Sequence, residues 1–239
     1  EHLERWPNSA TTAHASIYLG NLLEYRREWQ AAVEAFRSVP AEHAQFAASV
    51  AGAERAYRNW IASTAADDPA RPATLRAAAE HFEKVSLGPE SAWPRTWTPP
   101  LRAAALAAAR FRLQQSPPDF DRASRILDVA RRANPPADEA WLASATAEQA
   151  VALAGLNRFD EAEQLLTQAA GDDPLRLLER LERLEALADQ SQDDQRRAQL
   201  AKLTLAGLQT LQKAGKLPAE AQSRVQRLTA QAQADGLDR

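Results

Sequence analysis

Residues 159–169 read FDEAEQLLTQA, and the spacing of four apolar side chains within them decides the fold class of this chain. Phe159, Ala162, Leu166 and Ala169 follow one another at offsets of three, four and three residues. Such offsets place all four side chains on one face of an α-helix, where they form one buried stripe. The same pattern occurs three more times, at Trp29-Ala32-Phe36-Val39, Leu75-Ala78-Phe82-Val85 and Phe120-Ala123-Leu127-Ala130.

The distances between these stripes predict a stack of helical hairpins. Successive stripes begin at residues 29, 75, 120 and 159, so they are 46, 45 and 39 residues apart. Regular spacing of this size is typical of helical repeat proteins, in which each unit covers an apolar face of its neighbour. HEAT and armadillo solenoids have comparable periods. Here, however, the additional length lies in proline-rich insertions, which favours shorter helix pairs with extended turns.

The composition of the 239-residue chain supports an all-α protein. Apolar residues make up 45% of the chain but aromatic residues only 6%, which favours close packing of Ala-rich helices. The eight glycines and the scarcity of β-branched runs argue against sheets. A net charge of −3 gives no reason to expect nucleic acid as a partner.

Prolines and helix-capping residues divide the chain into four helix pairs and a terminal segment. The terminal helices have a polar outer face and suit the capping role that solenoids require. A coiled-coil dimer is the alternative for them, but their apolar stripe is wider than a coiled-coil seam. The expected pairs are 9–40, 41–90, 97–135 and 137–174, and the capping helices are 174–235.

Two small residues are expected to permit close contact between helices. Gly20 lies inside the first expected helix, where it costs about 1 kcal/mol relative to Ala. We infer that it allows the returning helix to approach beside Ala32. We also expect Ala162 to pack against Ala150. Leu22 is predicted to face inward with Gly20.

Two tryptophans, Trp93 and Trp97, lie in a proline-rich segment between the second and third pairs. Pro94, Pro99 and Pro100 prevent a continuous helix there. One interpretation is a binding loop with aromatic anchors. The other is a plug that covers the apolar groove between neighbouring repeats. We favour the plug, because exposed tryptophans promote aggregation.

The sequence contains no pattern of catalytic or metal-binding residues. The absence of cysteine excludes disulfides and zinc fingers. Paired aspartates at 67–68, 172–173 and 193–194 occur where helices start, so capping explains them. We therefore expect no enzymatic activity, no metal and no cofactor. The histidines are far apart and lack the spacing of metal ligands; they are His2, His14, His43 and His81.

Residues 143–174 resemble a tetratricopeptide repeat (TPR) over their whole length. Ala150 precedes Phe159 by nine residues, and Asn157 with Arg158 occupies the turn between the helices. The first pair is similar in both helices, whereas the third is similar in its second helix and the second in its stripe alone. The resemblance covers about residues 9–174. It implies a right-handed α-solenoid whose first helices line a concave groove for peptides or partner helices.

By the same resemblance, the groove would be lined by one face of the first helices. Its mixed polarity suits an extended or helical protein segment. The proposed groove residues are His14, Ile17, Asn21, Glu24, Tyr25, Arg102, Arg112, Ser144 and Val151, with Trp93 and Trp97 as loop anchors under the binding-loop interpretation.

The function expected from these features is a non-enzymatic scaffold for protein–protein interaction. The alternatives are a structural or assembly subunit of a bacterial envelope complex and a regulatory module excised from a larger protein. A bacterial source is indicated by 25 Arg against 4 Lys, which is typical of GC-rich genomes. The compartment is the cytoplasm or the periplasm and cell envelope. No apolar run reaches the roughly 20 residues that span a bilayer, although an anchor upstream of Glu1 stays open.

Overall fold

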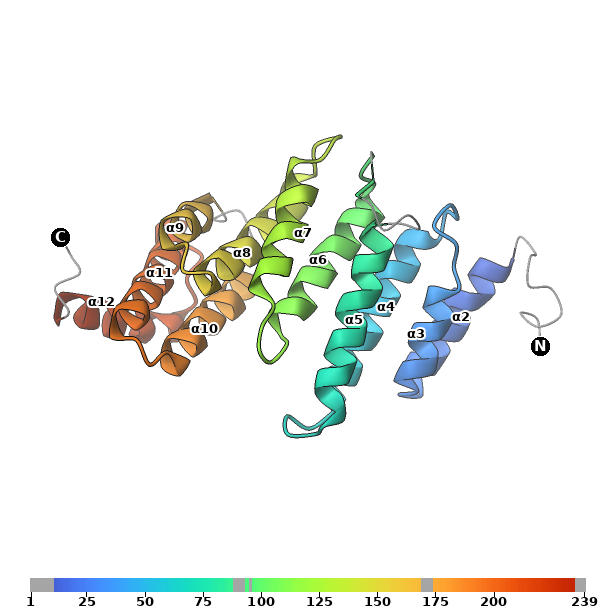
Figure 1. Cartoon of the computed structure of the whole chain (residues 1–239), viewed down its shortest axis with the longest axis horizontal. Coiled ribbons are helices and arrows are strands. Elements are labelled where there is room, and N and C mark those ends of the chain that lie inside the picture. The colour runs from blue at the N-terminus through green and yellow to red at the C-terminus, as the bar shows by residue number, and fades with distance from the viewer. Residues whose placement is uncertain (1–10, 88–92, 95, 169–173, 235–239) are drawn as a thin grey trace. The chain divides into compact units, whose positions relative to one another are not determined.

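The computed structural model describes residues 11–87, 93–94, 96–168 and 174–234. In those residues it contains eleven α-helices, one short 3-10 segment and no strand (Figure 1). The all-α prediction is therefore confirmed. The chain divides into two compact units, Glu1–Pro118 and Asp119–Arg239, and we describe each separately. The division falls inside the expected pair 97–135, so the pairing of its two helices stays a prediction.

The N-terminal unit contains five of these helices. Each helix packs against the next one in the sequence, and α4 also packs against both α2 and α6. Helix α5 begins at Ala70, five residues before its stripe starts at Leu75. The side chain of Asp68 accepts a hydrogen bond from the Ala70 amide at 2.8 Å. The helices are α2 (Thr12–Tyr25), α3 (Trp29–Arg37), α4 (Phe46–Ser63), α5 (Ala70–Leu87) and α6 (Pro99–Leu113).

The C-terminal unit contains the remaining six α-helices. Within it, α8 packs against α7, α9 and α10, while α11 packs against α9, α10 and α12. The helices are α7 (Phe120–Arg132), α8 (Glu139–Gly155), α9 (Phe159–Gln168), α10 (Pro174–Gln190), α11 (Asp194–Lys213) and α12 (Gln222–Ala234), the last preceded by the 3-10 segment Ala219–Ala221.

The repeated stripes form the core of both units. In every stripe, the central Ala and the bulky residue that follows it are buried, as the sequence predicts. Ala169, the last member of the fourth stripe, lies outside the described residues. The buried members are Ala32, Phe36, Ala78, Phe82, Ala123, Leu127, Ala162 and Leu166.

Gly20 of α2 permits a close helix contact with Phe36 of α3. The structure shows that Gly52 of α4 permits a second close contact with the same side chain. A Cβ atom on Gly20 would lie 2.7 Å from the ring of Phe36, and one on Gly52 would lie 2.5 Å from the same ring. Both distances are shorter than a van der Waals contact. Phe36 of α3 therefore packs directly on the backbones of α2 and α4. The contact predicted beside Ala32 is made one helical turn further on.

Aspartates begin several helices in the way that the sequence predicts. Asp119 accepts a hydrogen bond from the Arg122 amide, and Asp138 accepts one from the Trp141 amide. Asp193 accepts from the amides of two following residues, which satisfies donors that the first turn of α11 leaves free. The pairs at 67–68 and 193–194 thus have a structural role. Residues 172–173 lie outside the described part of the chain.

Candidate functional site

An ion-pair network joins α2 to α4 in the N-terminal unit and contains two of the predicted groove residues, Asn21 and Glu24. The Arg55 Nε donates to both carboxylate oxygens of Glu24 at 2.9 Å, and its Nη2 donates to Asn21 Oδ1 at 3.0 Å. Asn59 donates to the same carboxylate at 2.9 Å. Hydrogen bonding to Glu24 raises the pKa of Arg55. His14 lies at the other end of α2, where its Nε2 atom is 3.3 Å from the side-chain Nε2 of Gln45.

Beside this network, α2 exposes a second row of apolar and aromatic side chains. Tyr18, Leu22 and Tyr25 are 74%, 46% and 87% exposed, and their spacing of four and three residues places them on one face. The exposure of Tyr25 is compatible with its predicted place on the groove face, which stays a prediction, whereas the inward orientation expected for Leu22 is wrong. The spacing of the three residues was the signal that could have identified this row. We call these residues, together with His14, Asn21, Glu24 and Arg55, the α2–α4 face.

The exposed surface of α4 continues this face with small side chains. Ala47, Ala48 and Ala51 are exposed, so another polypeptide can approach the helix closely there. Arg58, three residues after Arg55, is also exposed and has no hydrogen-bond or ion-pair partner in the described part of the chain. The remaining surface of α4 therefore carries the unpaired guanidinium of Arg58 beside a row of small alanine side chains.

The other predicted groove residues do not lie on an open surface. Arg102 is 3% exposed and donates to the Trp97 carbonyl at 3.2 Å, and Arg112 forms a 2.8 Å ion pair with Glu83. Ser144 and Val151 are buried in α8.

We therefore remove Arg102, Ser144 and Val151 from the candidate site. The cause in α8 is that residues 144–154 are buried on every side, because three other helices pack around them. Ile17 is half-buried on α2.

The tryptophan segment has one buried member. Trp97 is 2% exposed, and its ring stacks against that of Trp93 with centroids 6.0 Å apart. A side chain with so little accessible surface cannot serve as an exposed anchor for a partner. Trp97 therefore packs as the plug interpretation requires, while Trp93 is half-buried.

His81 is a largely buried titratable group that packs against the aromatic core of the N-terminal unit. Its ring contacts Phe82 and Tyr57, with centroids 4.7 and 5.9 Å away. Burial, together with the charges of Arg37 and Lys84, lowers the pKa of His81 to about 4. His81 is thus neutral at physiological pH and packs as an aromatic side chain.

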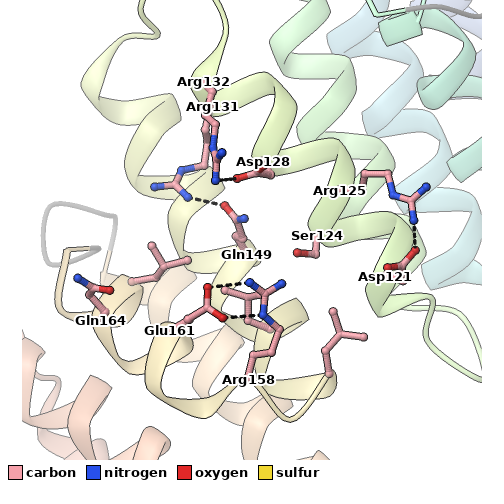
Figure 2. Close-up of a pocket in the computed structure, with 13 residues that line it drawn as sticks. Asp121, Ser124, Arg125, Asp128, Arg131, Arg132, Gln149, Arg158, Glu161 and Gln164 are labelled. Carbon is pink, nitrogen blue, oxygen red and sulfur yellow. Dashed lines mark hydrogen bonds and ion pairs between the residues drawn. The ribbon is translucent and has the colours of Figure 1, made fainter.

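A polar pocket of about 350 Å³ opens between α7, α8 and α9 in the C-terminal unit (Figure 2). Four arginines and three carboxylates line it, together with Gln149 and three leucines. The sequence analysis did not identify this pocket, because its residues come from three helices and have no shared local pattern. The charged residues are Asp121, Arg125, Asp128, Arg131, Arg132, Arg158 and Glu161.

Comparison with known proteins gives no match to a family model, to a curated protein or to a solved structure. The resemblance to TPR proteins accordingly stays a prediction. No helix in the described ranges is both long enough and apolar enough to cross a bilayer. Across the same residues, no cluster of three or more His, Cys, Asp or Glu is placed to hold a metal ion.

Proposed function

We propose that this chain is a non-enzymatic scaffold of TPR-like helix pairs that holds a partner polypeptide against the α2–α4 face. The observation that carries the proposal is the exposure of Tyr18, Leu22 and Tyr25 beside the Glu24–Arg55 ion pair. Tyrosines offer a large contact area at a small cost in conformational entropy and are enriched at protein interfaces. Apolar exposure of this kind marks an interaction surface more often than a solvated helix.

The packing order within each unit supports the repeat arrangement. In the N-terminal unit, α4 contacts both α2 and α6, which are the first helices of the neighbouring expected pairs. In the C-terminal unit, α8 contacts α10 and α9 contacts α11. When helix pairs stack, first helices pack on first helices and second helices on second helices. In the N-terminal unit, the first helices α2 and α4 thus lie side by side, as a shared binding surface requires.

The charges of the face favour an amphipathic helix with acidic residues as the partner. Glu24 is neutralised by Arg55, and Glu54 forms a 3.2 Å ion pair with Arg110. The remaining charge is that of Arg58, so the face carries an excess positive charge. The exposed alanines of α4 let a partner helix approach closely, and the apolar side of the partner helix would pack against Tyr18, Leu22 and Tyr25. Acidic residues of the partner helix would then pair with Arg58.

Selection of binding peptides from a phage-displayed library on the intact chain tests this proposal. The affinity of a selected peptide is measured by calorimetry for the parent chain, for a Tyr18→Ala/Tyr25→Ala variant and for Arg58→Glu. We expect both variants to weaken binding by about tenfold or more, because buried interface tyrosines commonly contribute 2 kcal/mol or more.

The matched control is Arg76→Glu on α5, which makes the same charge change at an exposed position of the same unit. It should leave the affinity unchanged, and circular dichroism should show that all variants stay folded. Selected peptides that bind all variants equally well would remove the α2–α4 face as the binding surface. Failure to enrich any peptide sequence would contradict the scaffold function itself.

A further inference from the structure

The pocket between α7, α8 and α9 has the size of a small-molecule site, and it lies in a different unit from the α2–α4 face. Its volume of about 350 Å³ falls within the usual range of ligand pockets, roughly 300–1,000 Å³. Leu156 and Leu165 are half-buried and line it, and Leu153 lies beneath them on α8. The pocket thus combines ten polar or charged side chains with an apolar surface of three leucines.

Three of its four arginines are already paired with carboxylates. Arg125 and Asp121 form a 2.8 Å ion pair along α7. Arg158 donates twice to Glu161, at 2.6 and 2.7 Å.

The third pair lies next to the remaining arginine. Arg132 forms a 2.8 Å ion pair with Asp128 (Figure 2), and this leaves Arg131 without a bonded carboxylate. Because four arginines face three carboxylates, the lining carries one excess positive charge.

Arg131 holds this excess charge in a partly desolvated position. Its guanidinium reaches from α7 towards α8 and donates to Gln149 Oε1 (Figure 2). Its Nε atom is buried without a hydrogen-bond partner. Burial lowers the pKa of Arg131, which reflects the cost of keeping a charge there, yet a guanidinium stays protonated at neutral pH. A bound anion would offset that cost.

We propose that this pocket binds a small aliphatic carboxylate, whose carboxylate group pairs with Arg131 and whose carbon chain packs on Leu156 and Leu165. A monoanion matches the single excess charge. A dianion such as phosphate would be repelled by Asp128 and Glu161 on the two sides of the pocket. Planar carboxylates also suit the fork of donors that a guanidinium presents. The hydroxyl of Ser124, which lines the same pocket, supplies a further donor.

Titration of the full chain with 4-methylpentanoate, followed by ligand-observed NMR and calorimetry, tests this site. The neutral isostere 4-methylpentanamide and inorganic phosphate serve as comparison ligands. We expect saturable binding of the carboxylate and about tenfold to hundredfold weaker binding of the amide, since a charge-assisted hydrogen bond contributes roughly 1.5–3 kcal/mol. Phosphate should bind more weakly than the carboxylate.

Variants locate the site in the pocket. Arg131→Gln should weaken binding by about tenfold or more. Arg197→Gln, which removes an arginine that pairs with Asp194 on α11 and does not line the pocket, should leave the affinity nearly unchanged. Leu165→Asn should also weaken binding while keeping the guanidinium, and it tests the site if Arg131→Gln fails to fold.

Three results would overturn the proposal. They are no saturable binding at millimolar carboxylate, equal binding of acid and amide, and phosphate binding as tight as that of the carboxylate. Because the α2–α4 face lies in the other unit, failure here leaves the proposed scaffold function standing.

Discussion

Replacing Gly20 with Ala tests how closely α2 and α3 are packed in the N-terminal unit. The added Cβ would lie 2.7 Å from Cε1 and Cζ of Phe36, while carbon atoms in contact are about 3.5–4 Å apart. The ring or a helix must therefore move by about 1 Å. Overpacking of this kind costs about 1–3 kcal/mol, whereas the higher helix propensity of Ala returns about 1 kcal/mol. We expect Gly20→Ala to destabilise the chain by about 0–2 kcal/mol.

The background variant Phe36→Leu separates the two effects. Without the ring, the overpacking term disappears, and Gly20→Ala should then be neutral or stabilise by up to about 1 kcal/mol. Urea denaturation followed by far-ultraviolet circular dichroism gives the free energy of unfolding of each variant. The coupling between the two substitutions in a double-mutant cycle should be about 1–3 kcal/mol.

An independent control measures the propensity term alone. Ala51 is exposed on α4, so Ala51→Gly should cost about 1 kcal/mol without any change in packing. If Gly20→Ala stabilises the parent chain as much as it stabilises the Phe36→Leu background, the coupling is zero and the packing argument is refuted. Gly52→Ala, whose Cβ would lie 2.5 Å from the same ring, should show a coupling of the same sign.

Three further predictions concern buried residues. Acidification should destabilise the chain through His81: its pKa is about 4 in the folded state and 6.5 ordinarily, so the unfolded chain binds the proton first. Stability should fall as the pH drops below 6.5 and the loss should level off near pH 4, at about 3 kcal/mol; equal pH slopes for the parent and His81→Gln in urea denaturation would contradict this. Glu148 and Arg180 form a buried ion pair with 3.2 Å between Arg180 Nε and Glu148 Oε1. Glu148→Gln, which removes one charge of this pair, should cost about 3–5 kcal/mol of stability. In thermal melts, the double variant Glu148→Leu/Arg180→Leu should lose less stability than either single Leu variant. Ala162→Leu should cost about 1–3 kcal/mol by overpacking α9 against α8, and an unchanged melt would mean that Ala162 does not face Ala150.

The buried helix α8 shows where sequence patterns stop being informative. Asp138 caps the start of α8, and the turn that follows the end of α8 was predicted at Asn157. The orientation of α8 was not predicted. Apolar and small residues occur on every side of α8, so no face is distinguished by composition. Ser144 and Val151 were assigned to an open groove by the TPR resemblance, although other helices cover both.

The charged residues show the same limit. Glu24 was assigned to the groove by the TPR resemblance, and its ion-pair partner Arg55 is 31 positions away. In the sequence, Arg131 and Arg132 are two adjacent basic residues with nothing to distinguish one from the other. Only the packing of α7 on α8 brings Gln149 within hydrogen-bond distance of Arg131, while Asp128 forms its ion pair with Arg132.

The sequence by itself determined that this protein is helical, where most of its helices begin and end, and which residues form the buried stripes. Those features depend on offsets of three and four residues and on capping side chains, which act within one helix and are written in local order. The tertiary structure alone decided which faces stay exposed and which charges remain unpaired. These depend on how neighbouring helices pack, and a shift of one helix by a single turn exchanges every contact it makes. The exposed tyrosine row of α2 and the unpaired guanidinium of Arg131 are both results of that packing.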